Sequence, residues 1–211
     1  MPNPSTKLIY IMDPMCSWCW AFTQPLADWR KKHLDLTCDY IVGGLAPDSD
    51  QPMSQEMQQS IARIWHQIES QTGARFNHDF WNLNTPRRST YPACRAVISA
   101  GNHVEQGREK MSYAIQTAYY QQAKNPSDLD VLLECAIHIG LSESDFLKDM
   151  ASDDVQNQLA NELEAVSRLG VGGFPALLLV TENGYEPLSL GYSSAEKLET
   201  RFQRLVQTGL S

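Results

Sequence analysis

Two cysteines separated by two residues, Cys16 and Cys19, stand close behind a short apolar segment near the start of the chain. Residues 8–13 are rich in β-forming side chains and end at an Asp-Pro pair, which predicts a buried strand. Apolar residues then recur at helical spacing over residues 20–29. The sequence thus places the cysteine pair between a strand and the first turn of a helix, which limits the chain to folds that begin in this way.

A long helical segment follows the first elements. A second strand is predicted over residues 36–42, so the chain opens with a βαβ unit that has a right-handed crossover. Residues 52–150 then carry helical patterns only, apart from residues 73–91, which lack clear periodicity. Helix starts are predicted at Pro92, near Glu105, at Asp128 and at Ser142.

The final part of the chain predicts a helix, a hairpin and another helix. The first of these helices ends at Gly170, and the apolar run of residues 176–180 predicts a strand. Residues 182–184 form a tight turn into a return strand over residues 186–190, and Ser193 is expected to cap the last helix. The predicted fold class is therefore α/β, with a βαβ unit and an αββα unit separated by a large all-helical insertion.

The charge balance narrows the classes of partner. With 17 basic and 25 acidic residues the formal net charge is −8, which argues against a general nucleic-acid binder or a protein that binds anionic membranes. No stretch approaches the roughly 18 to 20 apolar residues of a membrane helix, and residues 1–6 are too polar to open a secretory signal. We therefore expect a cytoplasmic protein. Five cysteines, an odd number, also argue against a secreted disulfide framework.

The cysteine pair lies where a helix start stabilises negative charge. Free backbone N–H groups and the helix dipole favour an anion there, and thus a thiolate. Two sulfurs two residues apart at a helix start reach disulfide geometry with little strain, so the pair can close and reopen in exchange with substrates. Cys16 is predicted to be the attacking sulfur, and Cys19, one turn further along, the resolving sulfur. Ser17 and Trp18 are expected to tune the helix start and to contact the substrate.

Two other interpretations of the cysteine pair stay open at this level. The pair can be half of a zinc site, but a structural zinc ion needs four ligands, and the sequence offers neither a second Cys-x-x-Cys pair nor a His-x₃₋₅-His pair. We therefore expect no metal site. Both cysteines can also be inert residues of the core. The isolated Cys38, Cys94 and Cys135 are interpreted in that way, as small buried hydrophobic residues.

A second motif precedes the third predicted strand, where residues 172–175 read Gly-Gly-Phe-Pro. With the Cys-Ser-Trp-Cys motif of residues 16–19 and the helical insertion, it makes nearly the whole chain resemble the DsbA-like thioredoxin-fold thiol–disulfide oxidoreductases, closest to the FrnE-like protein disulfide isomerases of the cytoplasm. The resemblance implies that the bond before Pro175 is cis and that this proline faces the cysteines. It also implies that Phe174 offers backbone hydrogen bonds to an extended substrate.

The resemblance further implies a domain organisation and an activity. Residues 1–51 and 151–211 would form a thioredoxin-like domain, and residues 52–150 a helical domain inserted into it. The activity implied is dithiol–disulfide exchange, as an oxidoreductase or a protein disulfide isomerase. Its partners would be thiols or disulfides of proteins and peptides, or glutathione and small disulfides, without a metal, organic cofactor, nucleic acid or membrane. Arg87 and Arg88 are interpreted as a solvated basic pair, with binding of a glutathione carboxylate as the alternative.

Departures from the family pattern keep alternatives open. Residues 17–18 include neither the histidine of DsbA itself nor the proline of thioredoxin, so the redox potential does not carry over. Phe174 stands where a small or β-branched residue is usual, and with Trp18 and Trp20 it is expected to form an apolar collar for substrates. A glutathione-dependent kappa-type transferase or isomerase is one alternative, although that class usually carries serine at the position of Cys16. A non-catalytic, chaperone-like peptide-binding module is the other.

Overall fold

The computed structural model describes residues 6–182 and 184–209 of the chain. Residues 1–5 of the polar N-terminal segment and Asn183 of the predicted turn lie outside the described residues. None of the helices in the described part is long and apolar enough to cross a membrane. In chain order the elements are β1 (Lys7–Met12), α1 (Ser17–Arg30), β2 (Cys38–Val42), α2 (Gln55–Thr72), α3 (Phe80–Leu83), α4 (Tyr91–His103), α5 (Gly107–Tyr120), α6 (Leu129–His138), α7 (Glu143–Met150), α8 (Asp153–Arg168), β3 (Ala176–Thr181), β4 (Gly184–Leu190) and α9 (Ala195–Gly209).

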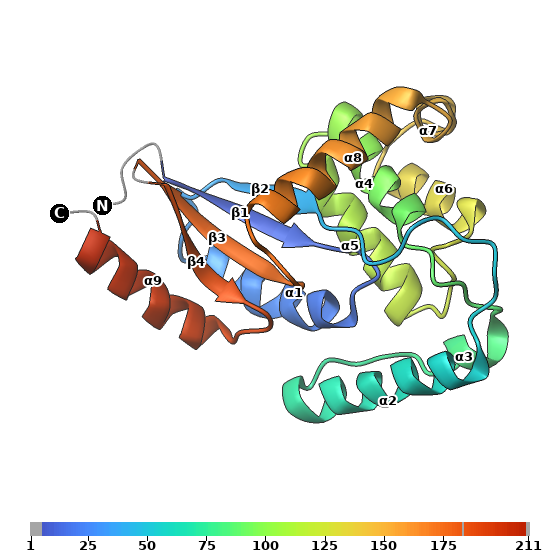
Figure 1. Ribbon diagram of the computed structural model, residues 1–211, viewed down its shortest axis with the longest axis horizontal. Helices are drawn as coiled ribbons and strands as arrows, with labels where there is room; N and C mark the ends of the chain where they lie inside the picture. Colours follow the sequence, from blue (N-terminus) through green and yellow to red (C-terminus); the bar gives the residue numbers. More distant parts are fainter. Residues whose placement is uncertain (1–5, 183, 210–211) are drawn as a thin grey trace.

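The four strands form one mixed sheet in the order β2-β1-β3-β4 (Figure 1). β1 runs parallel to β2, with Leu8 paired to Cys38, and antiparallel to β3, with Ile11 paired to Ala176. β3 and β4 form an antiparallel hairpin. The α/β fold class and the order of βαβ and αββα units predicted from the sequence are therefore confirmed.

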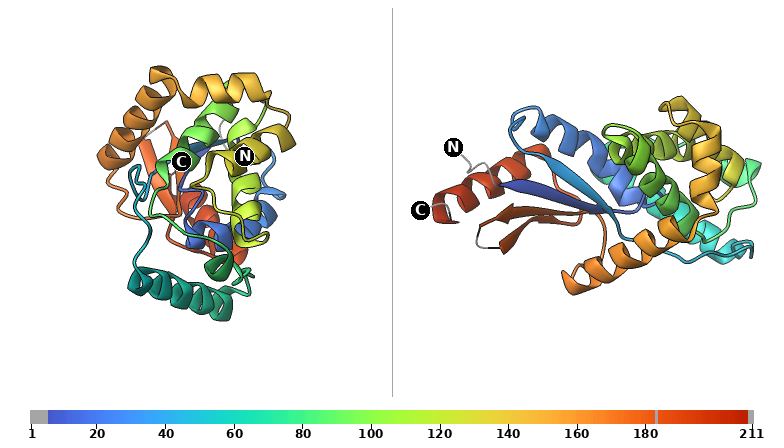
Figure 2. Two further views of the ribbon diagram at one scale, coloured as in Figure 1. Left: turned by 90° about the vertical axis from the view of Figure 1, so that its right-hand side faces the viewer. Right: turned by 90° about the horizontal axis from the view of Figure 1, so that it is seen from above.

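Helices cover both faces of the sheet (Figure 2). Tyr10 of β1 points to the face covered by α1 and α9, where it joins Phe22 and Phe202 in one cluster of buried side chains. Its neighbour Ile11 points to the opposite face and joins Val166 of α8 in a second cluster. Because alternate residues of a strand face opposite sides, the continuous apolar run of β1 is typical of a strand that is buried on both faces.

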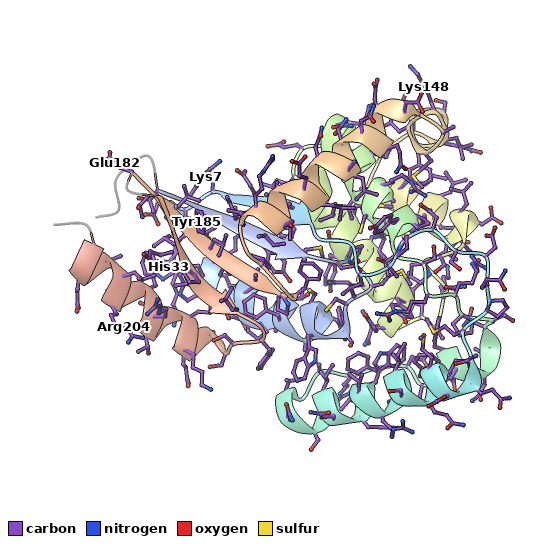
Figure 3. All side chains as sticks on the ribbon, in the orientation of Figure 1. Lys7, His33, Lys148, Glu182, Tyr185 and Arg204 are labelled. Atoms are coloured by element: carbon purple, nitrogen blue, oxygen red, sulfur yellow. The ribbon has the colours of Figure 1, made fainter. Side chains whose placement is uncertain are left out.

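Helix α1 packs its buried apolar face against the rest of the protein, and polar contacts near its end connect it to α9. Trp29 Nε1 donates a hydrogen bond to Glu199 Oε2 of α9 (2.9 Å). His33, labelled in Figure 3, lies 2.6 Å from the same oxygen. These contacts fix the axis of α1, and with it the helix start at which the cysteine pair stands. The buried residues of α1 are Cys19, Ala21, Phe22, Leu26 and Trp29.

Helices α2 to α7 gather at the end of the sheet where β1 leads into α1 (Figure 1). Their core also contains Met15 and Ala21, which flank the cysteine pair, together with Trp65 of α2 and Phe80 of α3. In the ribbon view α2 stands apart, yet side chains fill the space between it and the rest of the molecule (Figure 3). The helical segment is therefore packed onto the first turns of α1.

Local signals set both ends of α2, whereas the start of the last helix differs from the sequence prediction. At the start of α2, Ser54 Oγ accepts the N–H of Met57 (3.2 Å). Gly73 ends this helix with a φ of +75°, a conformation that a residue without a side chain adopts readily. The predicted cap of the last helix is wrong by one residue, since Ser194 Oγ accepts the N–H of Lys197 (3.3 Å).

Candidate active site

Cys16 occupies the N-cap position of α1, in extended backbone conformation (φ −81°, ψ 117°). Its N–H donates to the carbonyl of Asp13 (3.0 Å), and its own carbonyl accepts the N–H of Trp20 (3.0 Å). The residue is 7% exposed, and its Sγ lies 3.7 Å from the carbonyl oxygen of Phe174. The free N–H groups of a helix start favour a negative charge at this position.

Cys19 lies one turn further along α1 and is fully buried. The two thiols are free, and they are close enough to interact. Burial raises the pKa of the Cys19 thiol well above its usual value, and the hydrogen bond with Cys16 and the charge of Cys16 raise it further. Cys19 is therefore a neutral thiol in the reduced protein, and Cys16 is the more accessible sulfur of the pair.

The loop before β3 lies beside Cys16, and its Phe174–Pro175 peptide bond is cis. The ring of Phe174 packs onto Gly43, where a Cβ atom would come within 2.0 Å of the ring. The ring of Phe174 therefore fits in this position only because residue 43, directly after β2, is a glycine. Gly172 and Gly173 have open space where a Cβ would stand, so the close contact of this loop is made at Gly43 and not at the glycine pair.

Asp13 is buried at the end of β1 and connects three segments around the cysteine pair. Its Oδ1 accepts the N–H of Met15 (2.7 Å), and its Oδ2 accepts the N–H of Leu45 (2.7 Å) and the hydroxyl of Thr90 (2.6 Å). Burial raises the pKa of Asp13, although these hydrogen bonds lower it in part. The sequence marks Asp13 only as the end of a strand, because Leu45 and Thr90 lie 32 and 77 residues away.

A cavity of about 210 Å³ opens beside Cys16, and we call it the dithiol cavity. Ser17 and Trp18 line it from the start of α1. The helical segment contributes further walls. Its lining side chains from α2 and α5 are Ile61, Ile64, Trp65 and Tyr119.

The expected apolar collar of Trp18, Trp20 and Phe174 is not formed as a unit. Of the three, Trp18 lines the dithiol cavity, and its ring packs against Tyr192 with 6.0 Å between ring centroids. Trp20 stacks on Tyr120 of α5 at 5.7 Å and so belongs to the packing of the helical segment. Two residues two positions apart on a helix point to nearly opposite sides, which explains why the two tryptophans separate.

Arg87 and Arg88 both line the dithiol cavity, but their partners differ. Arg87 is half-buried and donates hydrogen bonds to the carbonyl of Ser127 (2.7 Å) and to Asp128. It is therefore a structural link to α6 and not the solvated residue expected from the sequence. Arg88 is exposed, and within the described residues it makes no hydrogen bond or ion pair. A guanidinium in this position is suited to a carboxylate ligand.

Burial holds the other three thiols in the protonated form near neutral pH. It raises the pKa of Cys38 to about 12 and that of Cys135 to about 11, and the pKa of Cys94 lies well above its usual value. We therefore expect a limiting amount of an alkylating reagent at neutral pH to modify Cys16 first in the reduced, folded protein. Peptide mapping by mass spectrometry measures the order, with the urea-unfolded protein as the control. Faster modification of Cys38 or Cys135 would contradict the prediction.

The sheet with helices on both faces and the cysteine pair at the start of α1 define a protein of the thioredoxin-fold class. Residues 8–203 match the DSBA-like thioredoxin domain family. The match spans both strand-containing regions and the helical segment between them. The chain belongs to this family, in agreement with the resemblance seen in its sequence.

Known proteins with the same fold include two bacterial relatives of known structure. A candidate protein disulfide isomerase from Nitrosomonas europaea has a TM-score of 0.83 over 97% of this chain and 98% of that one, at 27% identity. The cytosolic disulfide reductase DsbM from Pseudomonas aeruginosa has a TM-score of 0.79 over 97% and 100%, at 24% identity, and it was also solved with GSH. The ClpXP adapter protein SpxH of Bacillus subtilis (strain 168) is 22% identical over 178 residues, which are 83% of this chain and 58% of that protein. The match thus spans little more than half the length of that relative.

Proposed function

We propose that the protein is a thiol–disulfide oxidoreductase that reduces or isomerises disulfides, with Cys16 as the attacking sulfur and Cys19 as the resolving one. The observation that carries this proposal is the position of Cys16 at the N-terminus of α1, 3.7 Å from the carbonyl oxygen of Phe174. The helix start stabilises a thiolate there, and an extended substrate can pair with the backbone of the neighbouring loop. Membership of the DSBA-like family supports exchange chemistry on thiols and disulfides.

The proposed cycle passes two electrons from the dithiol to a substrate disulfide. The Cys16 thiolate attacks one substrate sulfur, forms a mixed disulfide and displaces the other sulfur as a thiolate, which takes up a proton. Cys19 then loses its proton and attacks the sulfur of Cys16, so that the intramolecular disulfide forms and the second substrate thiol leaves. Two molecules of a thiol such as glutathione restore the dithiol and leave as their disulfide. The cycle uses no metal and no organic cofactor.

The interaction between the two sulfurs orders these steps. The hydrogen bond with Cys16 and the charge of Cys16 contribute to the raised pKa of Cys19, so Cys19 stays protonated while Cys16 is free. Formation of the mixed disulfide removes the charge of Cys16 and, with it, that contribution. Attachment of a substrate therefore makes the resolving thiol more acidic, although burial still raises its pKa.

The dithiol cavity favours a small thiol or one extended segment of a peptide as its occupant. Its volume of about 210 Å³ lies below the roughly 300 to 1,000 Å³ of sites for larger ligands. Arg88 offers a guanidinium for a carboxylate of glutathione. DsbM, which has the same fold, was solved with GSH and is a cytosolic reductase, and we include glutathione and a cytoplasmic location in the proposal for this chain.

We expect the dithiol to equilibrate reversibly with glutathione and its disulfide, at a potential between about −180 and −270 mV. Ser17 and Trp18 add no cation to the helix dipole, so the pair should be less oxidising than DsbA at about −120 mV. The oxidised fraction in glutathione buffers is measured by alkylating the free thiols and determining the mass of the protein by mass spectrometry. Cys38→Ser is the control variant. A potential above about −140 mV would contradict this account of the thiolate. Failure to form the Cys16–Cys19 disulfide in any buffer would contradict the proposed thiol–disulfide oxidoreductase activity.

A further inference from the structure

Three side chains of metal-ligand type meet where α2 ends. His66 and Glu69 stand one turn apart on α2, and His78 belongs to the segment between α2 and α3. His78 Nε2 lies 3.0 Å and His66 Nδ1 lies 3.3 Å from the same oxygen, Glu69 Oε2. The three ligand atoms all lie within 4.8 Å of one another. We call these residues the α2 triad, and none of them lines the dithiol cavity.

The spacing of the triad resembles that of ligands around a tetrahedral zinc ion. Bonds of about 2.0 to 2.2 Å from zinc to nitrogen or oxygen place neighbouring tetrahedral ligand atoms roughly 3.3 to 3.6 Å apart. The two nitrogen–oxygen distances in the triad, 3.0 and 3.3 Å, already approach this separation. Two imidazoles, one carboxylate and a water molecule form a ligand set that zinc takes in proteins. An ion can therefore bind after rotation of one imidazole ring.

The surrounding contacts hold the triad in place. Glu69 Oε1 accepts the N–H of Phe76 (3.1 Å), which leaves Oε2 for the two histidines. The ring of His78 meets the buried ring of Trp65 edge-on at 5.8 Å. It also stacks on the ring of His66 at 4.1 Å, so one imidazole rotates when both nitrogens bind a common ion. Outer hydrogen bonds and packing of this kind orient metal ligands. A simple surface ion pair, in contrast, leaves long side chains free to move.

The triad has both the charge and the access that a cation needs. The carboxylate of Glu69 carries a negative charge at neutral pH and lies next to both imidazole nitrogens. The exposed fraction of the side chain is 67% for His66, 29% for Glu69 and 32% for His78. Solvent can therefore supply the ion and its fourth ligand.

We propose that His66, Glu69 and His78 bind a Zn²⁺ ion with water as the fourth ligand. The ion ties the end of α2 to the segment that leads into α3. Because α2 also supplies Ile61 and Ile64 to the dithiol cavity, bound zinc fixes one wall of that cavity. The proposal does not depend on the redox activity of the cysteine pair.

Zinc binding is measured by calorimetry on the full chain carrying Cys16→Ser and Cys19→Ser, which removes the dithiol as a competing ligand. We expect one Zn²⁺ per chain at neutral pH. His66→Ala should weaken binding at least about 10-fold, and the exposed position of His66 should preserve the fold, which circular dichroism checks. His78→Ala should have the same effect on the affinity. Bound zinc should also raise the melting temperature of the parent chain, which carries Cys16→Ser and Cys19→Ser alone. It should not raise the melting temperature of either histidine variant.

The matched control is His103→Ala. His103 pairs with Asp149 (3.0 Å) but belongs to no group of three ligands among the described residues, so this variant should keep the affinity of the parent chain. The visible spectrum with Co²⁺ in place of zinc provides a second readout, because nitrogen and oxygen ligands give no thiolate charge-transfer band. The proposal is overturned if zinc does not bind, if both triad variants bind it unchanged, or if His103→Ala loses as much affinity as they do.

Discussion

Replacing Cys16 with serine is expected to lower the rate of insulin reduction, above the uncatalysed background, by at least about 10³-fold. A serine hydroxyl cannot form a mixed disulfide, so the cycle stops before its first covalent step. The rate is followed with glutathione as the electron donor. Cys38→Ser is the matched control, because this thiol lies in β2 and burial raises its pKa to about 12. Its replacement should leave the rate unchanged.

Other outcomes of this comparison would assign the chemistry differently. Activity that survives in Cys16→Ser but disappears in a variant of Cys38, Cys94 or Cys135 would show that the nucleophile is another thiol. Peptide binding by the wild-type protein without any insulin reduction would favour a non-catalytic module. Circular dichroism of each variant separates a loss of chemistry from a loss of fold.

Replacing Asp13 with alanine is expected to lower the free energy of unfolding by about 3 kcal/mol or more, since each buried donor left unpaired costs about 1 to 3 kcal/mol. The donors that lose their acceptor are the N–H groups of Met15 and Leu45 and the hydroxyl of Thr90. Asp13→Asn keeps one carbonyl oxygen and should lose less. Urea unfolding measures the effect, with Asp28→Ala as the control for an exposed aspartate. An effect no larger than that of the control would show that the network does not stabilise the fold.

The same carboxyl group predicts a pH dependence of stability. Burial raises the pKa of Asp13 in the folded protein above the value of about 3.9 in the unfolded chain. Between these two values the unfolded chain has lost the proton and the folded protein has kept it, so the free energy of unfolding falls as the pH rises. Asp13→Asn lacks this titration. The stability advantage of the wild type over Asp13→Asn should therefore shrink as the pH rises through this window, and a constant difference would contradict the raised pKa.

Patterns that are local in the sequence are sufficient for most elements of the fold. The strand before Cys16, the helix that ends at Gly73 and the hairpin of β3 and β4 each depend on periodicity or turn chemistry within a few residues. The dithiol and its place at a helix start follow in the same way. Helix α3 is not predicted, because four residues, Phe80–Leu83, are too few to show a helical period.

Contacts between distant residues cannot be predicted from local patterns. The partners of Asp13 come from the loop after β2 and from the start of α4, and Phe174 fits only because Gly43 lies opposite its ring. The α2 triad matches no short metal-ligand motif in the sequence. His66 and His78 come together only because the segment after α2 folds back onto that helix. Tertiary packing, and not the spacing of residue types, creates each of these features.

The central claim, that Cys16 attacks a disulfide and Cys19 resolves the product, is tested most directly with the variant Cys19→Ala. Without the resolving thiol the mixed disulfide persists, so a substrate stays attached to the protein. The reduced variant is incubated with glutathione disulfide, and peptide mapping without reductant locates the adduct. The account predicts one glutathione per chain, on Cys16, stable in Cys19→Ala and transient in the wild type. An adduct on Cys38, Cys94 or Cys135, or one that persists equally in the wild type, would contradict it.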